Sequence, residues 1–210
     1  MKEIFAANLR TCPLIAILRG ITVPEIPEVC DALLEAGITL LEIPLNTPDA
    51  CRCIAAAVRH CAGRQLVGAG TVLTPDEVQA VKAAGGVFVV SPNTDAAVIR
   101  ETKACEMLSI PGFFTATEGF AALKYGADYL KLFPAVLGPG YVRDLKAVIK
   151  APILAVGGVN RQNLPDLMQV CAGAGIGSAL YKPGKSPDEV AIAARELAAA
   201  VKNSETIKNQ

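Results

Sequence analysis

The sequence of 210 residues predicts a single α/β domain folded as a (β/α)8 TIM barrel. Short runs rich in apolar and β-branched residues recur along the chain, and a segment with helical periodicity follows each run. Eight such units can be counted. No long linker, repeat break or shift in composition divides the chain, and eight parallel strands close more naturally into a barrel than into an open sheet.

The predicted strands have the four or five residues that are usual for a barrel strand. In chain order they are Leu14–Leu18, Leu40–Pro44, Leu66–Gly70, Val87–Ser91, Met107–Ile110, Tyr129–Phe133, Ile153–Gly157 and Gly173–Gly177. Because strand after strand is followed by a helix, the sheet is expected to be parallel and covered by helices on its outer face.

Several predicted helices open with a proline behind a threonine or serine, as at Thr74-Pro75 and Ser186-Pro187. The helices are predicted at Val23–Ala36, Pro48–Cys61, Pro75–Ala84, Asp95–Ala104, Thr117–Tyr125, Gly140–Ile149, Arg161–Val170 and Pro187–Val201. We expect residues 1–202 to form the barrel domain and residues 203–210 to form a polar C-terminal tail.

The composition excludes several classes of partner. Lys plus Arg and Asp plus Glu both number 20, so no basic surface for nucleic acid is predicted. No apolar run approaches the roughly 20 residues of a membrane span, and residues 1–10 lack the apolar core of a secretory signal. We therefore expect a cytoplasmic protein. Its 52% hydrophobic content is high and favours a homo-oligomer that buries apolar surface between subunits.

The seven cysteines are scattered and odd in number, which does not indicate a disulfide framework, so we expect reduced thiols. Cys51 and Cys53 are one residue apart, which is not the spacing of a zinc loop, and His60 is the single histidine. We expect neither a metal site nor a cofactor.

Three predicted strands carry a charge inside or at the end of an apolar run: Arg19, Glu42 and Lys131. Burying an ion costs several kcal/mol after relaxation unless it is paired, so each charge needs a reason. Alternation along a strand places Glu42 on the face of Leu40 and Lys131 on the face of Tyr129. If both faces point inward, the two groups meet at the mouth of the barrel.

A lysine among apolar neighbours such as Leu130, Leu132 and Phe133 loses part of its preference for the charged form, which suits it to attack a carbonyl carbon. A carboxylate opposite it, Glu42, can shuttle the protons that imine chemistry requires. The alternative is a structural ion pair between Glu42 and Lys131.

Glycines cluster behind the last two predicted strands, at Gly157-Gly158 and within Gly173–Ser178. Loops at these places in a barrel frequently bind phosphate, since glycine lets backbone N–H groups approach an anion. Tight strand–helix packing is the alternative. Behind the third strand, Thr71 can hydrogen-bond a carboxylate or keto oxygen, although Thr71 or Thr74 could instead cap a helix.

Nearly the whole chain resembles one family, the Schiff-base aldolases of 2-keto-3-deoxy-6-phosphogluconate (KDPG) and of its galactonate epimer (KDPGal). The runs that carry the resemblance are Leu14–Ile21, Glu42–Asn46, Gly68–Leu73, Ser91–Asn93, Pro111–Gly112, Thr115–Glu118, Leu130–Pro134, Ala155–Val159 and Gly175–Ser178, all in family order. The resemblance implies an aldehyde-lyase, a homotrimer, and pyruvate and glyceraldehyde 3-phosphate as products.

The resemblance also implies a role for each site residue. Lys131 would form the Schiff base and Glu42 would be the acid and base, while Arg19 and Thr71 would hold the pyruvyl end of the substrate. The groups implied for the phosphate are Gly158, Gly177 and Ser178.

The gluconate enzymes usually carry a carboxylate-binding arginine four residues after the glutamate, where this chain has Asn46. An arginine at Arg19 is similar to the galactonate branch and favours 2-dehydro-3-deoxy-6-phosphogalactonate as substrate. The gluconate epimer and 4-hydroxy-2-oxoglutarate stay open as alternatives. A metal-dependent aldolase or epimerase, and a sugar-phosphate binding barrel without catalysis, are the competing functions.

Overall fold

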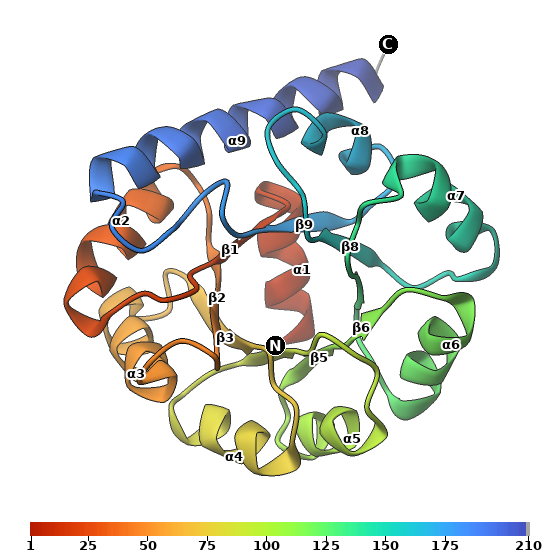
Figure 1. Ribbon diagram of the computed structural model, residues 1–210, viewed down its shortest axis with the longest axis horizontal. Helices are drawn as coiled ribbons and strands as arrows, with labels where there is room; N and C mark the ends of the chain where they lie inside the picture. Colours follow the sequence, from red (N-terminus) through yellow and green to blue (C-terminus); the bar gives the residue numbers. More distant parts are fainter. Residues whose placement is uncertain (209–210) are drawn as a thin grey trace.

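The computed structural model describes the backbone of residues 1–208 and the side chains of residues 1–201, and it is a parallel barrel ringed by helices (Figure 1). The strands are β1 (Leu14–Ile17), β2 (Leu40–Pro44), β3 (Leu66–Gly70), β4 (Phe88–Val90), β5 (Leu108–Ile110), β6 (Gly112–Phe113), β7 (Leu130–Leu132), β8 (Ile153–Val156) and β9 (Gly173–Ile176). Their order in the sheet is β5-β4-β3-β2-β1-β9-β8-β7-β6, and every pairing is parallel.

The nine segments amount to eight barrel strands, because β5 and β6 are consecutive and only Pro111 lies between them. Proline has no backbone N–H, so the ladder is interrupted there. β5 pairs with β4 on one side and β6 pairs with β7 on the other, and the Pro111 carbonyl accepts a hydrogen bond from the backbone N–H of Lys131 at 2.9 Å. The predicted (β/α)8 barrel is confirmed.

Helices follow the strands in sequence and cover the outside of the barrel (Figure 1). They are η1 (Val23–Glu25), α2 (Ile26–Glu35), α3 (Ala50–Cys61), α4 (Pro75–Ala83), α5 (Ala96–Ala104), α6 (Ala116–Tyr125), α7 (Gly138–Val148), α8 (Leu164–Met168) and α9 (Pro187–Lys208). Most match the predicted segments to within a few residues. The predicted Arg161–Val170 helix is reduced to the five residues of α8.

The last helix is longer than predicted, since α9 continues past Val201 to Lys208. Of the expected C-terminal tail, residues 209–210 lie outside the described residues. The boundary at residue 202 between a barrel domain and a tail stays a prediction. None of the described helices is both long enough and apolar enough to cross a lipid bilayer.

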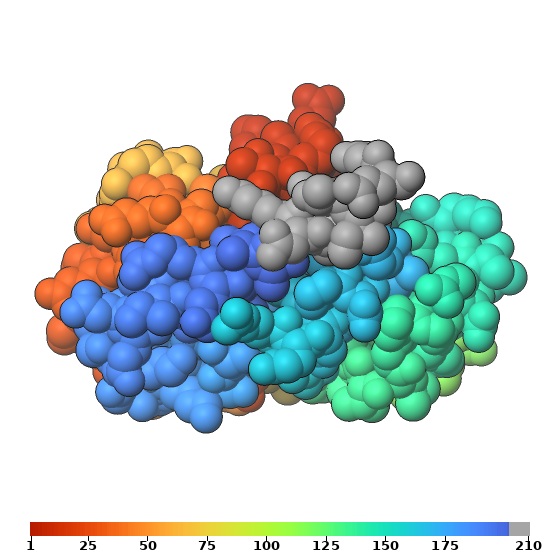
Figure 2. All heavy atoms as spheres, turned by 90° about the horizontal axis from the view of Figure 1, so that it is seen from above, coloured from red at the N-terminus to blue at the C-terminus, as the bar shows by residue number. Residues whose placement is uncertain are grey.

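A helix that the sequence analysis did not predict, α1 (Lys2–Thr11), closes the amino-terminal end of the barrel. It crosses the middle of the ring in Figure 1 and stands out from one end of the barrel in Figure 2. Phe5 and Leu9 are its buried residues, and they join the apolar cluster of the barrel interior. The Phe5 ring lies 5.3 Å from that of Phe88 and 5.1 Å from that of Tyr129, centroid to centroid.

Candidate active site

All seven residues expected at the site line one cavity of about 840 Å³. Glu42 lies in β2 and Lys131 in β7, whereas the others follow the carboxyl ends of their strands: Arg19 after β1, Thr71 after β3, Gly158 after β8, and Gly177 and Ser178 after β9. Loops at this end of a parallel barrel converge on one mouth, which explains why residues far apart in sequence meet there.

Glu42 and Lys131 are the only charged side chains within the described strands, and both are nearly buried, with 3% and 6% of their surfaces exposed. Each stands on the inward face of its strand, as the alternation predicted. Leu40 and Tyr129, two residues earlier, belong to the apolar cluster of the barrel interior. Apolar packing therefore fills the barrel below the two charges, which face the cavity above it.

The place of the Glu42 carboxylate depends on a glycine in the neighbouring strand. A Cβ added to Gly70 would come within 1.8 Å of Glu42 Oε1, far closer than two nonbonded atoms can approach. Gly68 makes room in the same way for the Phe88 ring, which a Cβ would meet at 2.4 Å. The glycines of the third strand therefore admit a carboxylate and an aromatic ring to the barrel interior.

Burial shifts both ionisable groups toward their neutral forms. It raises the pKa of the Glu42 carboxyl above its ordinary value, and the charges of Lys131 and Arg19 oppose this only in part. Burial likewise lowers the pKa of the Lys131 amine; the charge of Glu42 opposes the shift and that of Arg19 adds to it. No ion pair of 4.0 Å or less joins Glu42 to Lys131 in the described part of the chain. The structural ion pair left open by the sequence is therefore absent.

The apolar contact of the Lys131 amine comes from one of the three neighbours expected to supply it. The Phe133 ring lies 4.8 Å from Lys131 Nζ, centroid to nitrogen, and also lines the cavity. Leu130 and Leu132 instead pack in the cluster between the sheet and its outer helices. Residues next to Lys131 in a strand point to the opposite face, so the expectation for these two leucines was wrong.

Thr71 has an unusual backbone, with a φ of +55°. This left-handed conformation is a genuine outlier for a β-branched residue and carries a strain of the order of 1–3 kcal/mol. The helix cap is supplied by Thr74 instead, whose Oγ1 accepts a hydrogen bond from the backbone N–H of Glu77 at 3.2 Å. The capping role considered for Thr71 is therefore wrong, and Thr71 lines the cavity.

Arg19 is exposed at the rim of the cavity, on a loop that its neighbours fix in place. The backbone N–H of Gly20 donates a hydrogen bond to Thr47 Oγ1 at 2.9 Å. Gly20 has a φ of +81°, a conformation that glycine adopts without strain. Asn46, which stands where the gluconate enzymes usually carry an arginine, is exposed and is not among the residues that line the cavity.

The loop behind β8 turns through two glycines in the left-handed region, Gly157 at φ +89° and Gly158 at φ +74°. Asn163 Nδ2 donates to the carbonyl of Gly158 at 2.9 Å, and the Asn160 and Asn163 side chains also accept hydrogen bonds from backbone N–H groups of this loop. The loop is thus held from behind, and both glycines line the cavity.

Sequence reasoning missed several residues of the cavity wall. Asn160, Tyr181 and Lys182 line it beside the glycine loops, and Pro92 lines it from the loop behind β4. Lys182 is exposed and lies outside the strands, so the signal that revealed Glu42 and Lys131, a charge inside an apolar strand, was missing there. Pro92 stands in the Ser91–Asn93 run of the family resemblance, which was the available signal.

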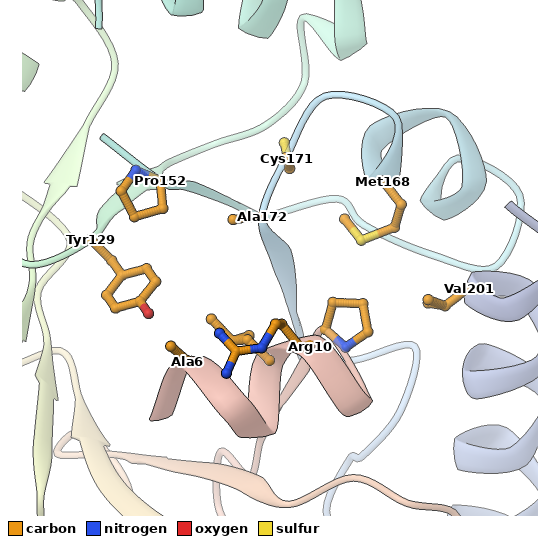
Figure 3. A pocket seen from close by; sticks show the side chains of 10 residues that line it. Ala6, Arg10, Tyr129, Pro152, Met168, Cys171, Ala172 and Val201 are labelled. Atoms are coloured by element: carbon orange, nitrogen blue, oxygen red, sulfur yellow. The ribbon is translucent and has the colours of Figure 1, made fainter. Parts of the chain in front are cut away.

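A second pocket, of about 420 Å³, lies at the amino-terminal end of the barrel, and none of the seven expected residues lines it. Figure 3 shows the Arg10 guanidinium and the Tyr129 hydroxyl at this pocket, with the Cys171 thiol on its wall. All seven cysteines of the chain are free thiols. Among the described residues, no group of three or more His, Cys, Asp or Glu side chains could hold a metal ion.

Comparison with known proteins finds relatives that match most of the chain. A probable 2-dehydro-3-deoxy-6-phosphogalactonate aldolase of Rhizobium meliloti (strain 1021) is 47% identical over 182 residues, covering 85% of this chain and 86% of the relative. The 2-dehydro-3-deoxy-6-phosphogalactonate aldolase of Escherichia coli (strain K12) is 45% identical over 194 residues, covering 90% and 93%. A solved structure described as native KDPGal superposes with a TM-score of 0.90 at 42% identity, covering 92% of this chain and 96% of that one.

Residues 5–194 match the family of KDPG and KHG aldolases, that is, nearly the whole barrel. The predicted enzyme class, an aldolase and hence a lyase, is confirmed by this match and by the two relatives. The chain belongs to the KDPG and KHG aldolase family.

Proposed function

We propose that this aldolase works through a Schiff base on Lys131 and cleaves 2-dehydro-3-deoxy-6-phosphogalactonate to pyruvate and glyceraldehyde 3-phosphate. The observation that carries the proposal is the pair of buried groups in one cavity: an amine whose pKa is lowered and a carboxyl whose pKa is raised. An amine and a carboxyl whose pKa values are shifted in these directions are suited to nucleophilic attack and to proton transfer near neutral pH.

The reaction begins when the neutral Lys131 amine attacks the C2 carbonyl carbon of the substrate, and loss of water from the carbinolamine leaves an iminium. Glu42 takes the proton of the C4 hydroxyl as the C3–C4 bond breaks. The electron pair of that bond moves to C3 and the iminium to give an enamine, and the aldehyde leaves. Protonation at C3 and hydrolysis of the imine then release pyruvate and restore the amine.

Arg19 and Thr71 are proposed to hold the pyruvyl end of the substrate, namely its carboxylate throughout the reaction and its keto oxygen until that oxygen leaves as water. A guanidinium offers a bidentate match to a carboxylate, and a hydroxyl can donate to an oxyanion. Gly158, Gly177 and Ser178 are proposed to hold the phosphate, with backbone N–H groups and the Ser178 hydroxyl as donors. Their common place on the cavity wall supports the assignment.

The galactonate epimer is proposed over the gluconate one because the arginine at the cavity is Arg19 and because both of the relatives compared are named for the phosphogalactonate. Purified protein should cleave the phosphogalactonate with a higher kcat/KM than the phosphogluconate or 4-hydroxy-2-oxoglutarate, measured as pyruvate release. Equal or faster cleavage of the phosphogluconate would refute the assignment of the galactonate epimer, and only the broader aldolase activity would remain.

The Schiff base is tested by incubation with pyruvate and borohydride followed by peptide mass spectrometry. One reduced pyruvyl group is expected, on Lys131. Labelling of helix lysines such as Lys82, Lys103 or Lys146 instead would overturn the mechanism. A sugar-phosphate binding barrel without catalysis would bind substrate but give neither label nor pyruvate.

Two broader expectations are part of the proposal. A homotrimer is supported by exposed apolar side chains around the cavity end, including Leu73, Phe133, Val136 and Leu137. Light scattering on the purified protein measures its mass directly. A cytoplasmic location is supported by the seven free thiols, which suit a reducing compartment. Cell fractionation tests it.

A further inference from the structure

We propose that Lys182 binds the phosphate group of the substrate and thereby makes the enzyme selective for phosphorylated sugar acids. The inference rests on the proposed function and adds to it a specificity residue on the loop between β9 and α9. Lys182 lines the cavity, and neither the sequence analysis nor the reaction steps above assign it a role.

Without Lys182, the described lining of the cavity has no cation left for the phosphate of the ligand. Among the described residues, one anion and three cations line the cavity: Glu42, and Arg19, Lys131 and Lys182. The substrate brings a carboxylate and a phosphate that carries about −1.5 to −2 at pH 7. The Lys131 amine must be neutral to attack, and Arg19 is assigned to the carboxylate. Lys182 is then the cation left to face the phosphate.

The local backbone places Lys182 beside the phosphate loop. The N–H groups of Leu180 and Tyr181 both donate to the carbonyl of Gly177, at 2.8 and 3.0 Å, so the chain behind β9 makes a tight helical turn. Ser178 lies within this turn and Lys182 directly follows it, and both line the cavity.

The residues on either side of Lys182 are fixed, whereas Lys182 itself is exposed. The hydroxyl of the buried Tyr181 donates to Glu25 Oε1 at 3.1 Å, which ties the turn to the start of α2. Pro183 packs on Gly20, where an added Cβ would lie 2.7 Å from Pro183 Cγ. The lysine is therefore anchored by its backbone close to the loop that carries Arg19.

The Lys182 amine makes no ion pair of 4.0 Å or less with the carboxylates of the described chain. Lys185, three residues later, differs: its Nζ donates to the carbonyl of Leu180 at 3.0 Å, and it is not among the residues that line the cavity. Lys185 therefore offers a matched control, since its replacement removes the same charge from the same loop.

The test compares Lys182→Gln with Lys185→Gln in two assays. Titration calorimetry with inorganic phosphate should show an affinity about fivefold to twentyfold lower for Lys182→Gln, and lower by less than about twofold for Lys185→Gln. With 2-dehydro-3-deoxy-6-phosphogalactonate, Lys182→Gln should raise KM by a similar factor and leave kcat nearly unchanged. The unphosphorylated sugar acid should be cleaved alike by all three proteins, and added salt should narrow the difference because the lysine is exposed.

Several results would overturn the inference: no detectable phosphate binding by the wild type, equal effects of the two variants, or an equal loss with phosphorylated and unphosphorylated substrates. Failure of the proposed function is recognised separately. It would appear as absence of the pyruvyl label on Lys131 in the wild type, while the phosphate titration would still report on Lys182.

Discussion

The two ends of the barrel use the same strands for opposite purposes. At the amino-terminal end, Phe5 of α1 packs against Phe88 and Tyr129 within the apolar cluster of the barrel interior. At the carboxyl-terminal end, the interior opens into a cavity of about 840 Å³ that holds Glu42 and Lys131. One end is built for stability and the other for chemistry.

The change from packing to chemistry takes place within two residues on each of two strands. Leu40 and Glu42 share the inward face of β2, and Tyr129 and Lys131 share an inward face at β7. The packed end thus provides a rigid base that fixes where the charged groups stand above it. Substitutions at the packed end should therefore change stability, and substitutions at the cavity should change activity.

The largest expected effect is at Lys131. Lys131→Arg keeps the positive charge but cannot form an imine, so turnover should fall by at least about 10⁴-fold and the pyruvyl label should vanish. The melting temperature should stay close to that of the wild type. Lys146→Arg on α7 is the control and should retain activity. Substantial turnover by Lys131→Arg would refute the Schiff base on this residue.

Glu42→Gln keeps the shape of the side chain but removes its titratable proton. Cleavage should fall about 10²–10⁴-fold, the usual contribution of general acid–base catalysis. Trapping of pyruvate on Lys131 should be slowed but not abolished. Turnover near the wild-type level would mean that Glu42 has no catalytic role.

The same variant predicts a shift with pH. Trapping requires the neutral amine, so its rate should rise with pH, with a midpoint below the ordinary lysine value of about 10.4 because burial lowers the pKa of Lys131. The negative charge of Glu42 opposes that shift, so removing it in Glu42→Gln should move the midpoint to still lower pH. A midpoint that moves upward would contradict this electrostatic account.

The sequence predicted the cavity end better than the packed end. Glu42 and Lys131 stood out because a charge inside an apolar strand is improbable without a function, and alternation along the strand fixed the side to which they point. The α1 helix was missed because it precedes the first βα unit and buries only Phe5 and Leu9, which is too few residues for a clear periodic signal. The steric role of Gly70 needed coordinates, since it depends on an atom of another strand.

At the packed end, Phe5→Ala should cost about 3–5 kcal/mol of unfolding free energy, as is usual for deleting a buried aromatic ring. Phe5 is fully buried, whereas Ile4 on the same helix is 53% exposed. Ile4→Ala is therefore the matched control and should stay within about 0.5 kcal/mol of the wild type. Denaturant unfolding measures both. At a temperature where Phe5→Ala is folded, its kcat should be close to normal; a large drop in kcat would show that the two ends are not independent.

The smallest expected effect compares two exposed arginines, one at each end of the barrel. Arg19 lines the cavity, and Arg10 on α1 lines the pocket at the opposite end (Figure 3). Arg19→Ala should raise KM for pyruvate exchange and for the full sugar acid alike by about tenfold to a hundredfold, because a charged hydrogen bond is worth about 1.5–3 kcal/mol and its loss weakens ground-state and transition-state binding equally.

Exposure of Arg19 to solvent favours the lower part of that range, and kcat should change little. Arg10→Ala removes the same charge from the opposite end of the barrel and should leave both KM values unchanged. The control therefore separates a long-range effect of charge from direct contact between Arg19 and the carboxylate. Steady-state kinetics of the two variants at one ionic strength decide the matter. If Arg19→Ala lowers kcat and leaves KM unaltered, the arginine stabilises the transition state and does not bind ground state and transition state equally. If both variants raise KM equally, neither arginine contacts the substrate.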